Sequence, residues 1–404
     1  MGHYTLTDQP ILRRALTIRK GKDRIGVSES ELTQAALEIF RRATQSDVDL
    51  ILAEKVLPDD WGRSRVWRYR VVQAPAGFPE TLIVKRSKIG GGHIFNEWAS
   101  LQFLHRFSSL RSLVPAFYGG NEALELLVLE DLGHVRGVDD LGAIMEGENP
   151  ALARDALLAH ARNMALLHRT TAGFERAFNA LRRTFPAYDR PISKDQFVDH
   201  FTWFLRMLSQ FGLDVSPKLT QEVESIITTL LDPHGPRAYT RGDVCPSNIA
   251  YSGQETRFYD FEMGAFRHIF LSAAYFRILH LSCFNGSLIP LALQTEAEQA
   301  YFQALAPLIP DPADYQIDMA AAATAMLIWM LSTTLEQALQ QDRPRHLASF
   351  RQRIFAAMTL YIDHETFSAS FSKMAEIVAA LRETLAGQWA EEEKTIAIFP
   401  AFRK

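Results

Sequence analysis

The pattern of hydrophobic residues changes near Gly133, and this change limits the possible folds more than any other feature of the sequence. Before Gly133, short strand-like runs dominate, with two amphipathic helices among them. The expected strands cover residues 48–56, 65–72, 81–85 and 124–129, and the expected helices cover residues 28–43 and 95–107. After Gly133, helical periodicity covers residues 151–172, 195–212, 218–231, 269–284, 292–306, 315–341, 346–362 and 367–387. We therefore predict an α+β fold with a small antiparallel-sheet lobe, residues 1–130, and a large, mainly helical lobe, residues 131–404.

The composition excludes several classes of protein. Of the 404 residues, 47% are hydrophobic and 22% are charged, and the formal net charge is −4. These values are typical of a globular protein. The sequence has no basic stripe interleaved with aromatic residues, so no nucleic-acid partner is expected. The longest apolar stretch, Met319–Leu331, is too short to span a bilayer and predicts a buried helix, so no membrane partner is expected. No pattern in the sequence predicts an oligomeric state.

The two cysteines, Cys245 and Cys283, provide neither a disulfide framework nor the spacing of a zinc site. We expect Cys245 to be a small buried side chain without a nucleophilic role. The first residues, Met1–Leu6, do not have a basic region followed by an apolar run, so no signal peptide is expected. Together these features predict a cytoplasmic protein.

Three polar residues have the separation along the sequence that a phosphoryl-transfer site requires. Asp243 is followed five residues later by Asn248 and twelve residues after that by Asp260. Transfer from a nucleotide needs one carboxylate to accept or orient the attacking hydroxyl, and an amide and a second carboxylate to hold Mg²⁺. Glu262 would share a face with Asp260 on a strand and could support a second metal ion or a water. The alternative is that each residue caps a turn, a helix or a strand.

A lysine and a glutamate precede this motif in the order that such a site requires. Lys85 ends an apolar strand, and Glu97 follows twelve residues later on the next helix. We expect Lys85 to hold nucleotide phosphates and Glu97 to orient it as an ion pair. Arg86 and Lys88 are alternative candidates for the cation that holds the phosphates, and any of the three could be a surface charge.

Two backbone segments complete the predicted nucleotide site. Gly62 and Ser64 lie in the turn Trp61–Val66, where glycine allows close approach of the backbone to phosphates and serine offers a hydroxyl or an amide. An ordinary hairpin turn explains this segment equally well. Glu130, Asp131 and Leu132 form the joint between the two lobes, and the triple glycine 90–92 reads as a flexible connection because no Lys-Ser or Lys-Thr pair follows it.

The segments Arg241-Gly-Asp-x-x-x-x-Asn248 and Asp260-Phe-Glu262 resemble motifs of the aminoglycoside phosphotransferase and choline kinase-like family, which carries H-G-D-x-x-x-x-N and then D-x-[DE]. The resemblance covers residues 48–262 and includes the Glu-Asp-Leu-Gly joint, where kinases receive the adenine edge. It implies a bilobal protein kinase-like fold, ATP or possibly GTP as donor, Mg²⁺, and a small-molecule hydroxyl acceptor. Arg241 departs from the family's histidine, which orders the catalytic loop. An arginine there could bond backbone carbonyls or pair with Asp260.

The acceptor is not specified by the motifs. Carboxylates that could recognise a polycation, and tryptophans that could form a cation site, are present in the helical lobe: Asp311, Asp314, Asp318, Glu336, Asp342, Asp363, Trp203, Trp329 and Trp389. The tryptophans are more often core residues at these spacings, and His160 and His168 are expected to be structural. The alternatives are a non-catalytic nucleotide-binding protein of the same fold and a kinase for proteins or glycated amines. The short segment after Glu262 disfavours a protein substrate.

Overall fold

The structure is a computed structural model, and the chain divides into two compact units that are described separately. The sheet unit comprises Met1–Trp98 and Phe117–Asp131, and the helical unit comprises Ala99–Ala116 and Leu132–Lys404. The residues that the structure describes are 26–57, 62–88, 92–133, 140–186, 194–252, 255–283, 285–309, 311 and 315–403. Trp61, Gly90, Gly91 and Asp314, named above, lie outside them.

The sheet unit contains a five-stranded antiparallel sheet with the order β1-β2-β3-β5-β4. The strands are β1 (Asp49–Lys55), β2 (Ser64–Val72), β3 (Thr81–Ser87), β4 (Phe117–Asn121) and β5 (Leu126–Glu130). The register places Lys85 of β3 opposite Val66 of β2 and Leu127 of β5. Because Lys85 lies on a central strand with neighbours on both sides, its backbone position is fixed by both ladders.

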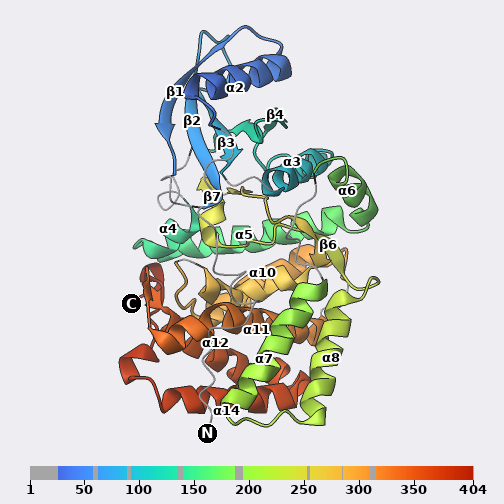
Figure 1. The fold of residues 1–404 in the computed structure, drawn as a ribbon, viewed down its shortest axis with the longest axis vertical. Coiled ribbons are helices and arrows are strands. Elements are labelled where there is room, and N and C mark those ends of the chain that lie inside the picture. Colours follow the sequence, from blue (N-terminus) through green and yellow to red (C-terminus); the bar gives the residue numbers. More distant parts are fainter. Residues whose placement is uncertain are drawn as a thin grey trace. The chain divides into compact units, whose positions relative to one another are not determined.

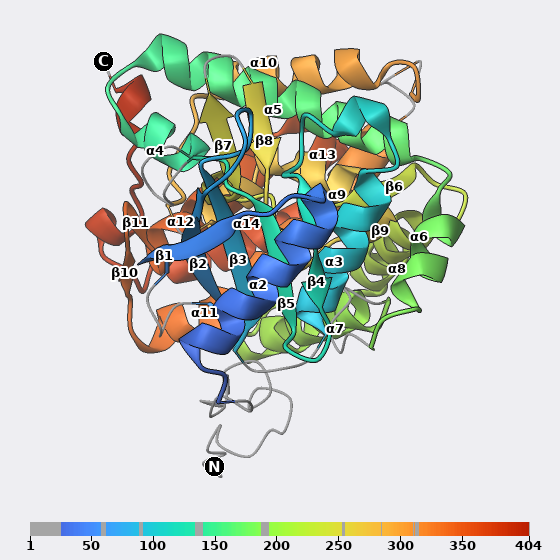
Figure 2. The ribbon, with the colours of Figure 1, turned by 90° about the horizontal axis from the view of Figure 1, so that it is seen from above.

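Helix α2 (Glu29–Thr44) covers one face of this sheet (Figure 2). Ser28 and Glu31 form a capping box that satisfies the first amide groups of the helix. One face of α2, including Ile39 and Phe40, is buried in a single core cluster with strand residues such as Tyr69 and Val84. Helix α3 (His93–Leu104) begins in this unit and continues into the helical unit.

The helical unit contains eleven further described helices (Figure 1). They are α4 (Leu141–Glu146), α5 (Pro150–Thr171), α6 (Glu175–Arg182), α7 (Lys194–Gln210), α8 (Pro217–Leu231), α9 (Phe270–Ala273), α10 (Leu291–Leu305), α11 (Gln316–Gln340), α12 (Phe350–Asp363), α13 (Glu365–Ser370) and α14 (Ser372–Ala386). A sheet followed by a largely helical region confirms the predicted fold class.

Helix α11 forms the centre of the helical unit and contacts α7, α8, α9, α12 and α13. It is the one described helix that is long and apolar enough to cross a membrane by length and composition. However, 67% of its most apolar window is buried inside the protein. The segment Met319–Leu331 is therefore part of a core helix, as the sequence predicted.

Two short antiparallel pairs interrupt the helices and carry the predicted catalytic loop. β6 (Arg237–Thr240) pairs with β9 (Ala265–His268), and β7 (Ile249–Ser252) pairs with β8 (Glu255–Phe258). The 3-10 turn η2 (Pro246–Asn248) leads directly into β7. The segment from Arg241 to Asn248 therefore begins and ends at a strand.

The predicted helix over 269–284 is wrong in its form. The structure has the single turn α9 followed by the 3-10 turns η3 (Ala274–Phe276) and η4 (Leu279–Ser282). This segment is buried from Phe270 to Ile278, so its apolar residues do not mark one helical face. The predicted helix over 367–387 is divided into α13 and α14, and β4, α4 and α6 were not predicted. The apolar C-terminal segment packs as expected, with Phe399 buried and Leu288 bridged to Ile398.

Candidate active site

In the sheet unit, Lys85 and Glu97 form a buried ion pair. The Lys85 Nζ atom lies 2.6 Å from Glu97 Oε2, and the two side chains are 10% and 2% exposed. Of the two other cations at the end of β3, Arg86 donates from Nε to the Leu124 carbonyl and Lys88 from Nζ to the Gly62 carbonyl. The ion pair with a buried carboxylate supports the assignment of Lys85, because a buried charge without a partner would be costly.

The turn before β2 is held against the start of α3. Gly62 has a φ of +63°, and the Arg63 carbonyl accepts a hydrogen bond from the Lys88 amide. Ser64 is buried, and its Oγ atom lies 3.2 Å from His93 Nε2. We expected Ser64 to offer either its hydroxyl or its amide to phosphates. The hydroxyl instead contacts His93 within the sheet unit.

The joint after β5 is fixed by an ion pair. Glu130 is the last residue of β5, opposite Leu82 of β3. The Asp131 side chain is 3% exposed, and its carboxylate accepts hydrogen bonds from Nε and Nη2 of Arg68. These bonds raise the pKa of Arg68. Asp131 therefore anchors the end of β5 to β2, and only backbone groups of this joint are expected to meet a ligand.

In the helical unit, the loop Arg241–Asn248 places Asp243 in a tight turn. The Cys245 amide donates to Asp243 Oδ1 over 3.0 Å, and no described residue hydrogen-bonds to Oδ2. Gly242 has a φ of +80°, and a Cβ atom there would lie 2.5 Å from the Met263 carbonyl oxygen. Only glycine combines this backbone conformation with so close an approach, which sets the direction in which Asp243 leaves the loop.

Asn248 is almost fully buried, with 1% exposure, and its side-chain Nδ2 atom has no hydrogen-bond partner among the described residues. Its backbone groups are used: the amide donates to the Cys245 carbonyl over 2.9 Å, and the carbonyl accepts from the Tyr259 amide over 3.3 Å. The bond to Tyr259 extends the β7–β8 register by one residue pair and brings Asn248 beside the residue before Asp260. A buried amide nitrogen without a partner requires an explanation, such as an ordered water, an ion or a ligand.

Asp260 and Glu262 lie in the turn between β8 and β9, not on a strand. Asp260 is partly exposed and has a φ of +61°, a conformation that is uncommon outside glycine and is often found at functional sites. The Phe261 side chain between them is fully buried and anchors the turn. The expectation that Glu262 shares a strand face with Asp260 is therefore wrong, because β8 ends at Phe258.

Arg241 bonds backbone carbonyls, one of the two arrangements that the sequence left open. It is 3% exposed, and its Nη1 atom donates to the Asn248 carbonyl over 3.0 Å and to the Tyr259 carbonyl over 3.3 Å. Its guanidinium lies over the Phe258 ring, 4.5 Å from the centroid. Burial lowers the pKa of Arg241 to about 10, opposed by the nearby Asp243, Tyr239 and Asp260. Arg241 thus ties together the segments that carry Asn248 and Asp260.

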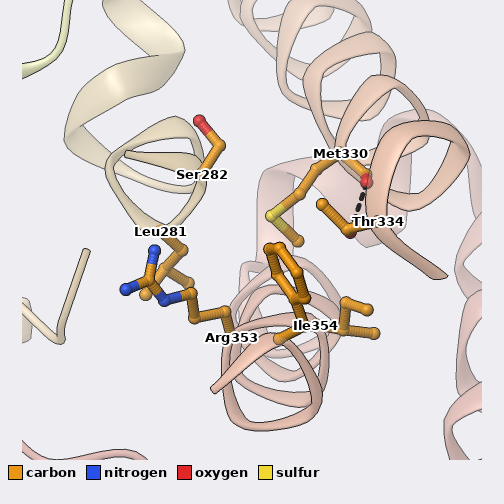
Figure 3. A pocket seen from close by; sticks show the side chains of 7 residues that line it. Leu281, Ser282, Met330, Thr334, Arg353 and Ile354 are labelled. Atoms are coloured by element: carbon orange, nitrogen blue, oxygen red, sulfur yellow. Dashed lines mark hydrogen bonds between the residues drawn. The ribbon is translucent and has the colours of Figure 1, made fainter. Parts of the chain in front are cut away.

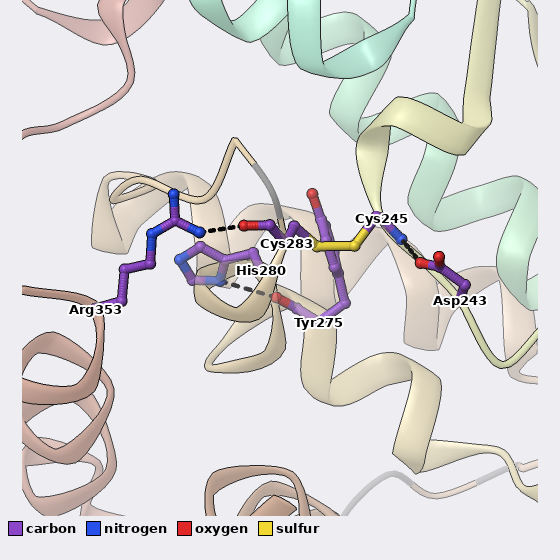
Figure 4. Close-up of a disulfide and its surroundings, with 6 residues drawn as sticks. All are labelled: Asp243, Cys245, Tyr275, His280, Cys283 and Arg353. Atoms are coloured by element: carbon purple, nitrogen blue, oxygen red, sulfur yellow. Dashed lines mark hydrogen bonds between the residues drawn. A yellow bond between two sulfur atoms is a disulfide. The ribbon is translucent and has the colours of Figure 1, made fainter. Parts of the chain in front are cut away.

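The expectation for the cysteines is wrong, because Cys245 and Cys283 form a disulfide (Figure 4). Their Cα atoms lie 5.5 Å apart, although 38 positions separate them in the sequence. No local pattern could have revealed this pairing, since the fold alone brings the catalytic loop to the end of η4. Cys245 was predicted to be a small buried side chain. In the structure it is disulfide-bonded and partly exposed.

The remaining candidates in the helical unit are structural. His160 and His168 are buried on α5. Burial lowers the pKa of His168 to about 3, and its Nδ1 atom lies 2.8 Å from the Tyr301 hydroxyl. Burial also lowers the pKa of His160 well below its ordinary value. Among the described residues, no group of histidines, cysteines and carboxylates has the arrangement of a metal site.

Several residues proposed for the acceptor already have structural partners. Asp318 contacts His268 Nε2 at 3.2 Å, and Asp342 accepts from the Arg351 amide over 3.1 Å. Trp389 is buried beneath the Arg351 guanidinium. These three side chains, Asp318, Asp342 and Trp389, therefore have structural contacts.

No family model and no curated protein matches the sequence. Solved structures do match. An ethanolamine kinase from Plasmodium vivax has a TM-score of 0.48 and 12% identity, over 92% of this chain and 98% of that one. A choline/ethanolamine kinase family protein from Mesorhizobium loti has a TM-score of 0.47 and 12% identity, over 85% and 99%. An aminoglycoside phosphotransferase solved with streptomycin and ATP has a TM-score of 0.43 and 12% identity, over 80% and 99%.

Across most of its length, the chain is thus structurally similar to choline and ethanolamine kinases and to aminoglycoside phosphotransferases. These are the proteins whose motifs the sequence resembles. At this identity and TM-score the matches concern overall architecture, and we base the function on the residues of this chain.

Proposed function

We propose that this chain is a small-molecule kinase that transfers the γ-phosphate of ATP to a hydroxyl group with the help of Mg²⁺. The observation that carries the proposal is the Asn248 side chain, which is 1% exposed and whose Nδ2 atom has no hydrogen-bond partner among the described residues. It stands in the same loop as Asp243 and beside the residue that precedes Asp260. Leaving a buried amide nitrogen unsatisfied costs about 1–3 kcal/mol, and a ligand or an ordered water in the site would remove that cost.

The donor set fits Mg²⁺. Asn248 offers an amide oxygen, and Asp260 and Glu262 offer partly exposed carboxylates, which are the hard oxygen ligands that this ion prefers. The protein does not fix which way the Asn248 amide points, so a metal ion can select its oxygen. When bound with the nucleotide, Mg²⁺ neutralises charge on the phosphates.

Asp243 would act on the acceptor. Because the Cys245 amide occupies Oδ1, Oδ2 is the oxygen available to accept or orient the proton of the attacking hydroxyl. Gly242 and the hydrogen bond from Cys245 fix the carboxylate before substrate arrives. Catalysis would then come from positioning and electrostatics rather than from a covalent intermediate.

Lys85 would hold the nucleotide phosphates, with Glu97 fixing the position of its ammonium group. The turn at Gly62 and Ser64 and the joint at Glu130 and Asp131 would contribute backbone groups. GTP could replace ATP, because none of these contacts reads the base through a side chain. The acceptor class is a small amino alcohol, an aminoglycoside-like compound or a related metabolite.

The proposal is tested by nucleotide binding and by turnover. Titration of the full chain with ATP should give binding that strengthens with Mg²⁺, and phosphate transfer should appear with one member of a panel of amino alcohols, aminoglycosides and sugars. Asp243→Asn should lose transfer by at least about a hundredfold yet still bind nucleotide. Asn248→Ala should lose the effect of Mg²⁺ on binding. Asp155→Asn, whose side chain is 64% exposed, is the matched control and should change neither.

The outcomes separate the proposal from its main alternative. Nucleotide binding without transfer to any acceptor would favour a non-catalytic nucleotide-binding protein of the same fold. Absence of any effect of Mg²⁺ on nucleotide binding would refute the assignment of Asn248 and Asp260. Normal turnover by Asp243→Asn would refute the role of Asp243.

A further inference from the structure

The disulfide between Cys245 and Cys283 joins the catalytic loop to the core of the helical unit. The Cys245 amide donates to Asp243 Oδ1 over 3.0 Å, and the Cys245 carbonyl accepts from the Asn248 amide over 2.9 Å. One peptide segment therefore contacts both the carboxylate assigned to the acceptor and the residue assigned to the metal. Whatever fixes Cys245 also fixes these two residues relative to each other.

The other end of the disulfide is held by α12 (Figure 4). Arg353 of α12 is 2% exposed and donates from Nη1 to the Cys283 carbonyl and from Nε to the Ala348 carbonyl. The Cys283 carbonyl also accepts from the Gly286 amide over 3.0 Å. Cys283 is thus a fixed point, and the disulfide transmits that position to Cys245.

The segment that carries Cys283 borders a small pocket. This pocket is lined by Leu281 and Ser282 from the segment and by Met330, Thr334, Ile354 and Arg353 from α11 and α12 (Figure 3). Cys245, in contrast, lies in a loop whose hydrogen bonds from Cys245 to Asp243 and from Asn248 to Cys245 are internal to that loop. Without the disulfide, the two ends could separate.

We propose that the Cys245–Cys283 disulfide is a redox modification site that positions Asp243 and Asn248, so that a dithiol switches the enzyme to a less active form. This inference rests on the proposed kinase function. As a residue, Cys245 is partly exposed whereas Cys283 is 1% exposed, so we expect a reductant to approach the disulfide from the side of Cys245.

The exchange is balanced. A thiolate of the dithiol attacks Cys245 Sγ, the S–S bond breaks, and its electron pair goes to Cys283 Sγ, which takes up a proton. The second thiolate of the reductant then displaces Cys245, which also becomes a thiol. The dithiol leaves as a disulfide, and two electrons have passed to the protein. A small-molecule disulfide reverses the reaction.

The test compares the full-length protein before and after treatment with dithiothreitol, which is then removed without oxygen. Alkylation should label no cysteine before reduction and both cysteines after it. Hydrogen exchange should become faster in the peptide that contains Cys245 and Asn248. Turnover should fall about tenfold or more, and oxidised glutathione should restore it.

The double variant Cys245→Ser/Cys283→Ser is the matched control. It should behave like the reduced protein before and after dithiothreitol. If this variant does not fold, restoration of the wild-type protein by oxidised glutathione carries the test alone.

The two proposals fail in different ways. Suppose that hydrogen exchange in the loop becomes faster on reduction but that neither the oxidised nor the reduced protein transfers phosphate. This result would refute the kinase function and support the coupling of the disulfide to the loop. Three other outcomes would each overturn the redox proposal and leave the kinase function intact. These are cysteines that alkylate without reduction, hydrogen exchange in the loop that does not change on reduction, and equal turnover by the oxidised and reduced forms of an active enzyme.

Discussion

Replacement of Arg241 by methionine should remove loop positioning with little loss of stability. The guanidinium is 3% exposed and donates two hydrogen bonds, to the carbonyls of Asn248 and Tyr259. Burial lowers its pKa from the ordinary value to about 10. The side chain remains charged at neutral pH, but this fall corresponds to roughly 3 kcal/mol against the charged form in the folded protein.

The two effects of the substitution nearly cancel. Loss of the hydrogen bonds to a charged donor costs roughly 1.5–3 kcal/mol each. The carbonyl of Asn248 keeps its bond from the Tyr259 amide, which reduces that cost. Removal of the buried cation returns roughly 3 kcal/mol, as in other buried charges replaced by apolar side chains. We therefore expect Arg241→Met to change the unfolding free energy by only about 1–2 kcal/mol.

The functional effect should be much larger. Without Arg241, the segments carrying Asn248 and Asp260 lose their common donor, and a displacement of about 1 Å at a reacting group can cost a hundredfold in rate. Chemical denaturation should measure the stability, and a Mg²⁺ titration of phosphate transfer should measure the effect on the metal. Arg241→Lys, which keeps the charge without the planar group that reaches both carbonyls, should be intermediate.

Arg154→Met provides the matched control, because this arginine is 48% exposed and pairs with Glu296. It should change neither stability nor metal dependence. If Arg241→Met instead lost 3 kcal/mol or more while its Mg²⁺ dependence stayed normal, Arg241 would be a stabilising residue and the reasoning would be wrong.

Three further predictions concern other parts of the chain. Lys85→Met should lower the unfolding free energy by about 3 kcal/mol in urea denaturation because it strips the buried Glu97 carboxylate of this ammonium, and Lys85→Met/Glu97→Leu should recover most of it. Because His168 has a pKa of about 3 when folded and 6.5 when unfolded, stability should fall below about pH 6.5 by up to ~1.4 kcal/mol per pH unit, less steeply in His168→Asn. Gly242→Ala should lower the melting temperature and abolish transfer, because its Cβ would lie 2.5 Å from the Met263 carbonyl oxygen. An unchanged value in any of these measurements would contradict the corresponding contact.

The sequence predicted the parts of the site that local patterns determine. Lys85 comes after the aliphatic residues Leu82–Val84 within β3, and Glu97 lies on α3, the next helix in the chain, so their approach could be predicted from the order of these two elements. Strand β4 was missed because Gly119 and Gly120 normally interrupt strands. In the structure, a Cβ atom at Gly120 would lie 2.5 Å from the Trp98 ring, so glycine is needed there for packing.

The features that were missed depend on residues far apart in the chain. The disulfide joins positions separated by 38 residues, and neither cysteine has a spacing that predicts a partner. The burial of Asn248 likewise cannot be read from its motif, because it arises where η2 meets β8. The two possible roles of Arg241 could be separated only when the carbonyls of Asn248 and Tyr259 were seen to face it.

The catalytic loop is held by contacts that serve its geometry more than the stability of the fold. Gly242 permits the close approach to Met263, Arg241 carries an electrostatic cost, and the disulfide attaches the same loop, Arg241–Asn248, through Cys245. A loop whose only role was to connect β6 with β7 would need none of these. Their coincidence around Asp243 and Asn248 is what a reaction controlled by positioning requires, since orientation of the reacting groups supplies much of the rate. Under the proposed function, Arg241 supports this loop through the carbonyls of Asn248 and Tyr259, in place of the histidine of the family that the motifs resemble.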